Sequence, residues 1–251
     1  MPKPRVVLLP GTGSDEIFIR SVFSGPLSGM GAEVITPPPP AESLLVSGYL
    51  RALDTLASAP REGAQEGPQD GALIVGGVSF GAHLAARWAL ANPHRCAGLI
   101  LALPAWSGQP GEAPASRAAR ASADLVEAHG LEAALRLSAD GVAPWLAAEL
   151  TRSWRRHGDG LAASLKVAAD SPAPELEALR RLEIPAGIAA CVDDPVHPAG
   201  VAHAWAEALP RAAVVETTLA ALGEDRESLG RAAVLAWLRA GGLPAGQGTA
   251  V

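Results

Sequence analysis

The sequence predicts an α/β fold in which a mostly parallel sheet of about six strands carries helices on both faces. Short apolar runs alternate along the chain with longer Ala- and Leu-rich windows, in which apolar residues recur at helical spacing. One long stretch, residues 105–181, contains helical patterns only and predicts a helical insertion. A chain of 251 residues is long enough to bury one sizeable core.

The predicted strands are short, continuous apolar runs, which are typical of parallel strands covered on both faces. They are Val6–Leu9, Ala32–Thr36, Ala72–Gly77, Cys96–Leu103, Ala186–Val192 and Ala212–Thr217. The helical windows between and after them are residues 15–30, 42–58, 81–91, 199–209 and 228–239. Pro26 is expected to break the first of these helices, because proline cannot donate the helical hydrogen bond.

The order of these elements predicts the domain organisation. Residues 1–104 and 182–240 are expected to form an α/β core, and residues 241–251 a flexible tail. The insertion 105–181 is expected to form a helical lid over the sheet, anchored by Trp106, Trp145 and Trp154. The arginines near the ends of its helices are expected to face solvent: Arg117, Arg120, Arg152, Arg155 and Arg156.

Composition excludes several classes of function. Acidic residues outnumber basic ones by 26 to 20, and the sequence has no basic stripe, which argues against nucleic acid as a partner. No run of 18 apolar residues predicts a membrane span, and the first residues do not resemble a signal peptide. Two cysteines are too few for a disulfide scaffold, so a reducing cytoplasmic setting is expected.

The strongest motif is Gly77-Val78-Ser79-Phe80-Gly81, a G-x-S-x-G between a predicted strand and a predicted helix. A sharp strand-to-helix turn holds its central residue in a strained conformation, and the flanking glycines avoid clashes. The turn would project the Ser79 hydroxyl above the sheet and leave the Phe80 N–H free to bind an oxyanion. The pattern therefore predicts a nucleophile elbow.

With this motif and context the chain resembles the α/β-hydrolase family over nearly all of its length. The first strand and its loop, VVLLPGTGSDEIF, are similar to the oxyanion loop of that family, although Pro10-Gly11 replaces the usual His-Gly pair. By position, the resemblance makes the backbone N–H of Thr12 the second oxyanion donor, beside that of Phe80. A backbone donor does not depend on the identity of the side chain.

The segment Val192-Asp193-Asp194-Pro195-Val196-His197-Pro198 is similar to the acid loop of the family, D-x-x-V/L-P. The match assigns the acid role to Asp194, with Asp193 as its nearest competitor. The alternative is that these aspartates only cap the following helix, where acidic residues are favoured.

The general base departs from the family pattern. The family carries its catalytic His in the loop after the last strand, but Glu224 stands at that place here, and no His follows His203. Three accounts remain open. In the first, His197 supplies the imidazole from the acid loop. In the second, Glu224 acts as the base or pairs with Asp194. In the third, the protein has lost ordinary triad chemistry, or the chain carries a His→Glu replacement at residue 224, and either leaves a binding scaffold or a weak esterase.

The resemblance implies a cofactor-independent serine hydrolase, esterase- or thioesterase-like, acting on a small apolar acyl compound. The alternative is a catalytically impaired binding or interaction protein with the same fold. Trp106 and Leu103 are expected to line the pocket for the acyl substrate. No metal-ligand or phosphate-loop spacing is present, so no cofactor or metal is expected; the substrate is the expected partner, without nucleic acid or membrane, and a homodimer is left open.

Overall fold

The six strands form one parallel sheet in the order β2-β1-β3-β4-β5-β6 in a computed structural model that describes residues 3–60 and 72–242. The strands are β1 (Arg5–Leu9), β2 (Glu33–Ile35), β3 (Leu73–Val78), β4 (Cys96–Ala102), β5 (Ala186–Cys191) and β6 (Ala212–Thr217). All six predicted strands are therefore confirmed, with ends that differ by at most one residue. Residues 243–251 of the expected tail lie outside the described residues.

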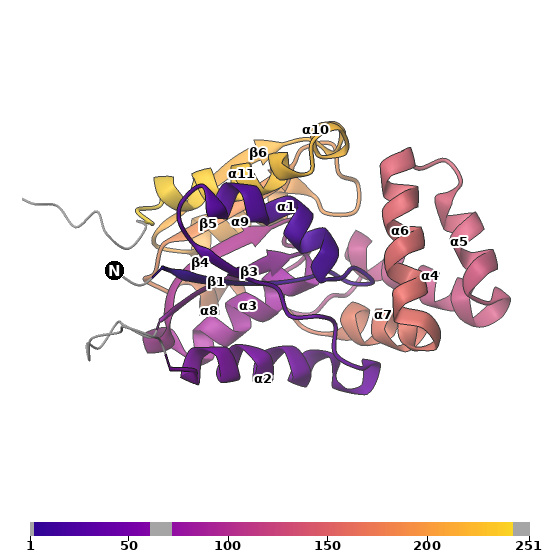
Figure 1. The fold of residues 1–251 in the computed structure, drawn as a ribbon, viewed down its shortest axis with the longest axis horizontal. Coiled ribbons are helices and arrows are strands. Elements are labelled where there is room, and N and C mark those ends of the chain that lie inside the picture. Colours follow the sequence, from indigo (N-terminus) through magenta and orange to yellow (C-terminus); the bar gives the residue numbers. More distant parts are fainter. Residues whose placement is uncertain (1–2, 61–71, 243–251) are drawn as a thin grey trace, which may run out of the picture.

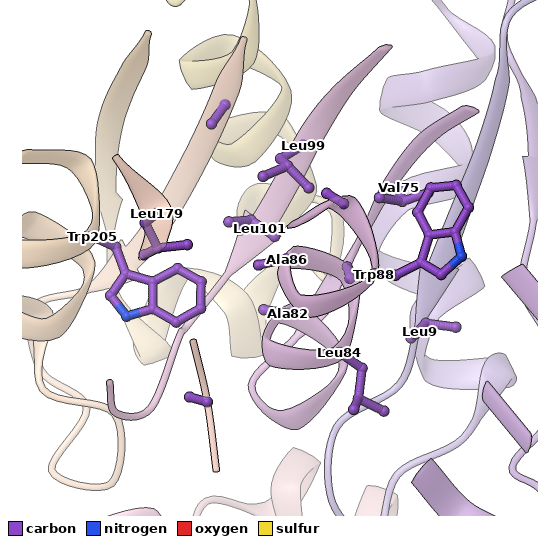
Figure 2. Close-up of a cluster of buried hydrophobic side chains, with 14 of the residues drawn as sticks. Leu9, Val75, Ala82, Leu84, Ala86, Trp88, Leu99, Leu101, Leu179 and Trp205 are labelled. Atoms are coloured by element: carbon purple, nitrogen blue, oxygen red, sulfur yellow. The ribbon is translucent and has the colours of Figure 1, made fainter. Parts of the chain in front are cut away.

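Helices cover both faces of the sheet, as Figure 1 shows. One face carries α1 (Glu16–Ser28) and α11 (Glu227–Arg239); the other carries α2 (Leu45–Ser58), α3 (Phe80–Ala91) and α9 (Ala199–Ala208). Each face buries its own apolar cluster. Figure 2 shows part of the cluster on the α3 side, where Trp88 lies near Val75 of β3, Ala86 near Leu101 of β4, and Trp205 near Leu179.

The insertion 105–181, all of which the structure describes, contains helices and no strand. Its helices are α4 (Pro114–His129), α5 (Leu131–Ala139), α6 (Pro144–His157), α7 (Leu161–Asp170) and the short α8 (Leu176–Leu179). Helices α4 to α7 group together beside one end of the sheet (Figure 1). They share a small apolar cluster around Trp154 and Leu165, separate from the two clusters of the sheet.

The structure differs from the sequence-based expectation at two places. Pro26 lies inside α1 rather than ending it. Its missing N–H leaves the carbonyl of Val22, four residues earlier, without the usual helical donor, and Gly230 of α11 packs closely on that carbonyl. The second is a helix that was not predicted, α10 (Leu219–Glu224), which begins at Thr218, whose hydroxyl accepts the N–H of Ala221 at 3.0 Å.

Candidate active site

Four loops converge at the carboxyl edge of the sheet, because all the strands are parallel. Ser79 follows β3, and Leu103 follows its neighbour β4. Asp194 and His197 lie in the loop after β5, and Thr12 lies in the loop after β1. The order of the strands therefore brings together residues that lie far apart in the sequence.

The strand-to-helix turn at Ser79 has the strained backbone that the motif predicts. Ser79 has φ 53° and ψ −115°, a region that residues with a side chain rarely occupy. Its N–H donates to the carbonyl of Ala102 at 2.9 Å, which fixes the turn to β4. A Cβ on Gly77 or Gly81 would lie 2.3 or 2.1 Å from the carbonyl oxygen of Leu9, so only glycine fits at either position.

The loop after β5 holds a carboxylate and an imidazole three residues apart. One carboxylate oxygen of Asp194, Oδ1, accepts the backbone N–H groups of Val196 and His197 at 2.8 and 3.1 Å. The other, Oδ2, lies 2.8 Å from Nδ1 of the His197 ring. Burial alone would raise the pKa of Asp194, but the hydrogen bond and charge of His197 and the two backbone donors hold it below its usual value.

The imidazole of His197 reaches the Ser79 hydroxyl. Its Nε2 lies 3.0 Å from Oγ of Ser79, although 118 residues separate the two in the sequence. Because the ionised Asp194 can only accept a hydrogen bond, Nδ1 of His197 carries the proton and Nε2 is free to accept the Ser79 proton. The three side chains thus have the contacts of a nucleophile, a base and an acid that orients the base.

The loop after β1 lies directly against the elbow. A Cβ on Gly11 would lie 3.2 Å from the carbonyl oxygen of Val78 and 3.5 Å from Cβ of Ser79. Thr12 follows, and among the described residues no hydrogen bond donated by its N–H is found. The N–H of Phe80 is the first of α3, so it has no acceptor within that helix. Two backbone donors are therefore available beside Ser79.

The two other candidate carboxylates, Asp193 and Glu224, lie outside the contact between Ser79, His197 and Asp194. Asp193 is exposed, and its Oδ1 accepts the N–H of Leu219 at 2.6 Å, so it caps the start of α10. Glu224 is exposed at the end of α10, and within the described part of the chain it forms no hydrogen bond or ion pair. The structure gives no support to a carboxylate pair between Glu224 and Asp194.

Two buried apolar side chains follow β4, the neighbour of the strand that leads to Ser79. Leu103 and Trp106 are both 6% exposed, and Leu103 has a positive φ of 52°. His83, one helical turn after Ser79, accepts the N–H of Ala105 at 3.0 Å and lies edge-on to the Trp106 ring at 4.6 Å. Burial and the nearby charge of His197 lower the pKa of His83 to about 3, so it is neutral at physiological pH and packs as a core residue.

The expectation that the insertion arginines face solvent was wrong for Arg152, whose side chain is 32% exposed, whereas Arg156 is exposed but also contacts a buried acid. Arg152 pairs with Asp15, which is fully buried, and Arg156 pairs with Glu16, which is nearly so. Arg155 is exposed and pairs with the exposed Glu132 of α5, as a solvated residue would. Sequence periodicity identifies the faces of a helix, but it does not identify a partner 137 residues away. The one sequence feature that could have indicated this ion pairing was the acidic pair Asp15-Glu16 at the start of α1.

A cavity of about 200 Å³ lies beyond these pairs, bordered by Pro38, Pro39, Arg156, His157 and Ser164 among others. No residue of the Ser79–His197–Asp194 contact lines it. Among the described residues, no cluster of His, Cys, Asp and Glu side chains could hold a metal ion. No helix in the described part of the chain is both long and apolar enough to cross a membrane.

The sequence matches no protein-family model, and no curated protein matches it either. Several solved structures do match, and each match covers most of this chain and most of the other chain. The enol-lactonase from Burkholderia xenovorans LB400 has a TM-score of 0.67 at 17% identity, with 95% of this chain and 92% of that chain covered. A putative non-heme bromoperoxidase from Mycobacterium tuberculosis H37Rv has a TM-score of 0.66 at 16% identity, covering 94% and 92%.

A thermophilic esterase from Thermogutta terrifontis gives a TM-score of 0.63 at 18% identity, covering 95% of this chain and 90% of that one. Identities this low carry information about the backbone arrangement and not about the substrate. Together with the parallel six-stranded sheet and its helical layers, they show that the chain has the α/β-hydrolase fold.

Proposed function

We propose that the protein is a serine hydrolase that cleaves esters or thioesters of small apolar acyl groups, with His197 as its general base. The observation that carries this proposal is the continuous contact from Asp194 through His197 to Ser79, at 2.8 and 3.0 Å. It favours the first of the three accounts of the base. Hydrolases and esterases among the structures of similar fold support the reaction class.

Each step of acyl transfer has a group in place. Oγ of Ser79 attacks the substrate carbonyl while Nε2 of His197 takes its proton, and Asp194 stabilises the imidazolium that forms. The N–H groups of Thr12 and Phe80 donate to the oxygen on which negative charge develops. His197 then returns the proton to the leaving group, and water releases the acyl group by the same steps in reverse order.

The burial of the site supports a small substrate. Ser79 is 7% exposed and Asp194 9%, so little of the nucleophile is open to solvent. Phe80 follows Ser79 directly, and Leu103 and Trp106 follow the neighbouring strand β4; all three are buried apolar side chains, which suits a short acyl or aromatic group.

A fluorophosphonate probe tests the proposal. Its phosphorus should be attacked by Oγ of Ser79 with loss of fluoride, and peptide mass spectrometry should locate the adduct on Ser79. His197→Ala should label at least about 100-fold more slowly, because it lacks the group that takes the proton. Glu224→Ala is the control: it removes an ionisable side chain that is exposed and outside the contact, so it should label at the wild-type rate.

The outcomes separate the competing functions. Absence of labelling of the folded protein between pH 6 and 9 would overturn the proposal and favour the binding-protein alternative. Labelling that proceeds equally well in His197→Ala would remove His197 from the mechanism. Slow labelling of Glu224→Ala with normal labelling of His197→Ala would assign the base to Glu224 instead.

A further inference from the structure

We propose that helix α6 of the insertion sets the position of the oxyanion loop, residues 11–15, and that Arg152 is the positioning residue in this contact. This inference rests on the proposed function, because it concerns the donor that Thr12 supplies to the reacting oxygen. The contact joins the insertion to the core at the loop that completes the site. It predicts that a residue of the insertion which does not touch the triad controls the rate of the chemical step.

The central contact is a paired hydrogen bond between Arg152 and Asp15. The two guanidinium nitrogens lie 2.5 and 2.7 Å from Oδ2 and Oδ1 of Asp15, which is the geometry in which arginine binds a carboxylate most firmly. Asp15 is fully buried, and its Oδ1 also accepts the N–H groups of Ile17 and Phe18 at the start of α1. A buried carboxylate is costly without its partner, so the end of the loop depends on α6.

The next turn of α6 adds two contacts on the same side of the helix. Arg156 forms an ion pair with Glu16, whose side chain is 7% exposed. Nε2 of His157 lies 3.0 Å from the carbonyl oxygen of Ser14. Three consecutive residues of the loop and of the following helix, 14 to 16, are therefore each bound by the last two turns of α6.

The middle of the loop is also covered by this helix. The N–H of Ser14 donates to the carbonyl of Gly11 at 3.1 Å, which closes a turn with Thr12 and Gly13 at its centre. Gly13 has φ +67°, and a Cβ there would lie 3.1 Å from Nε1 of Trp154. The Trp154 indole of α6 thus lies against the turn that carries the Thr12 N–H.

The same loop contacts the nucleophile at its other end. Gly11 packs on Val78 and on Cβ of Ser79, at the distances given above. The oxyanion loop is thus held between the elbow on one side and α6 on the other, with Thr12 between the two contacts. Loosening the α6 side should let the Thr12 N–H move relative to Ser79, while the triad itself keeps its contacts. The expected effect falls on stabilisation of the transition state rather than on substrate binding.

Arg152→Gln tests the inference, with Arg155→Gln as the matched control. Both variants remove one positive charge from α6, but Arg155 contacts only the exposed Glu132. With p-nitrophenyl acetate, Arg152→Gln should lower kcat about 10- to 100-fold and change KM less than about threefold. The expected decrease in kcat is smaller than for complete removal of an oxyanion donor, because the Thr12 N–H is displaced rather than lost. Arg155→Gln should keep both constants within about twofold of the wild-type values.

Arg152→Lys provides a second variant in case Arg152→Gln does not fold. Lysine keeps the charge but cannot form the paired hydrogen bond, so kcat should lie between those of the wild type and Arg152→Gln. Hydrogen–deuterium exchange gives a readout that does not depend on turnover. Exchange should rise in the peptide covering residues 10–18 in both Arg152 variants, and should be unchanged there in Arg155→Gln.

The outcomes distinguish this inference from the proposed function. Faster exchange in residues 10–18 together with a lower kcat supports the positioning role. Unchanged exchange in the Arg152 variants overturns the contact, whatever the activity. Faster exchange with a normal kcat, or a loss that appears mainly in KM, overturns the role of the contact in the chemical step. If the wild-type enzyme neither turns over the ester nor labels at Ser79, the proposed function fails, and with it the positioning role, while exchange still decides whether α6 holds the loop.

Discussion

Replacing His197 with Gln is the sharpest test of the base. Glutamine fills a similar space and can still accept a hydrogen bond from Ser79, but it cannot take up the proton at neutral pH. The fold should tolerate the change, because Asp194 keeps the backbone N–H donors of Val196 and His197. Losing the hydrogen bond to the ring should cost about 1 kcal/mol of the free energy of unfolding.

The effect on catalysis should be much larger than the effect on stability. A positioned general base contributes about 10²- to 10⁴-fold to the rate. At 1.36 kcal/mol for each factor of ten, this range corresponds to about 2.7–5.4 kcal/mol of lost transition-state stabilisation. The contacts of His197 at 2.8 and 3.0 Å with both of its partners place the expected loss near the upper end of the range.

The assay compares kcat/KM for p-nitrophenyl acetate among the wild type, His197→Gln and Glu224→Gln, with urea unfolding to confirm that all three are folded. Glu224→Gln should match the wild type, since Glu224 is exposed and lies outside the contact. The reasoning is refuted if His197→Gln retains more than about a tenth of the wild-type activity. It is equally refuted if Glu224→Gln loses as much activity as His197→Gln.

Three further predictions follow from the same structure. Asp194→Asn should lower kcat about 10³- to 10⁴-fold in the same ester assay while the protein remains folded, because the imidazole loses the charge that orients it and stabilises its protonated form; a loss below tenfold would contradict the role of Asp194. Gly81→Ala should destabilise the protein in urea by at least about 3 kcal/mol, because its Cβ would lie 2.1 Å from the Leu9 carbonyl oxygen; unchanged stability would contradict that packing. Burial alone would raise the pKa of Asp15, but Arg152 and the backbone donors of α1 hold it below its usual value of 3.8. Its contribution to stability is therefore present above that value and is lost as the pH falls through the lower pKa of the folded state, so the loss of unfolding free energy between pH 5 and pH 2.5 should be smaller in Arg152→Gln than in the wild type.

The sheet and the elbow could be predicted from the sequence because their signals are local. Each strand is a continuous apolar run, and the glycines around Ser79 report a backbone conformation that few other residues can adopt. The helix α10 was missed because it is a single short segment that depends on its Thr218 cap and on Asp193 from another loop.

The contact between Asp194 and His197 had a local signal that could have been weighed more heavily. An Asp followed by Pro favours a turn, and a turn brings residues three apart close together. The distance from His197 to Ser79 depends instead on the order of β3, β4 and β5 in the sheet, which no single segment encodes. For that reason the sequence left three accounts of the base open, and the geometry favours one of them.

The placement of Asp194 and His197 on one loop also changes how the site can vary. In the pattern that the α/β-hydrolase resemblance implies, three separate segments must stay aligned for the triad to work, and each can drift independently. Here the carboxylate and imidazole share a segment of four residues, so a shift of the loop moves both and alters mainly their distance to Ser79. Under the proposed mechanism the segment after β6 carries no catalytic residue, so insertions or substitutions around Glu224 should be tolerated in natural variants and in engineered ones.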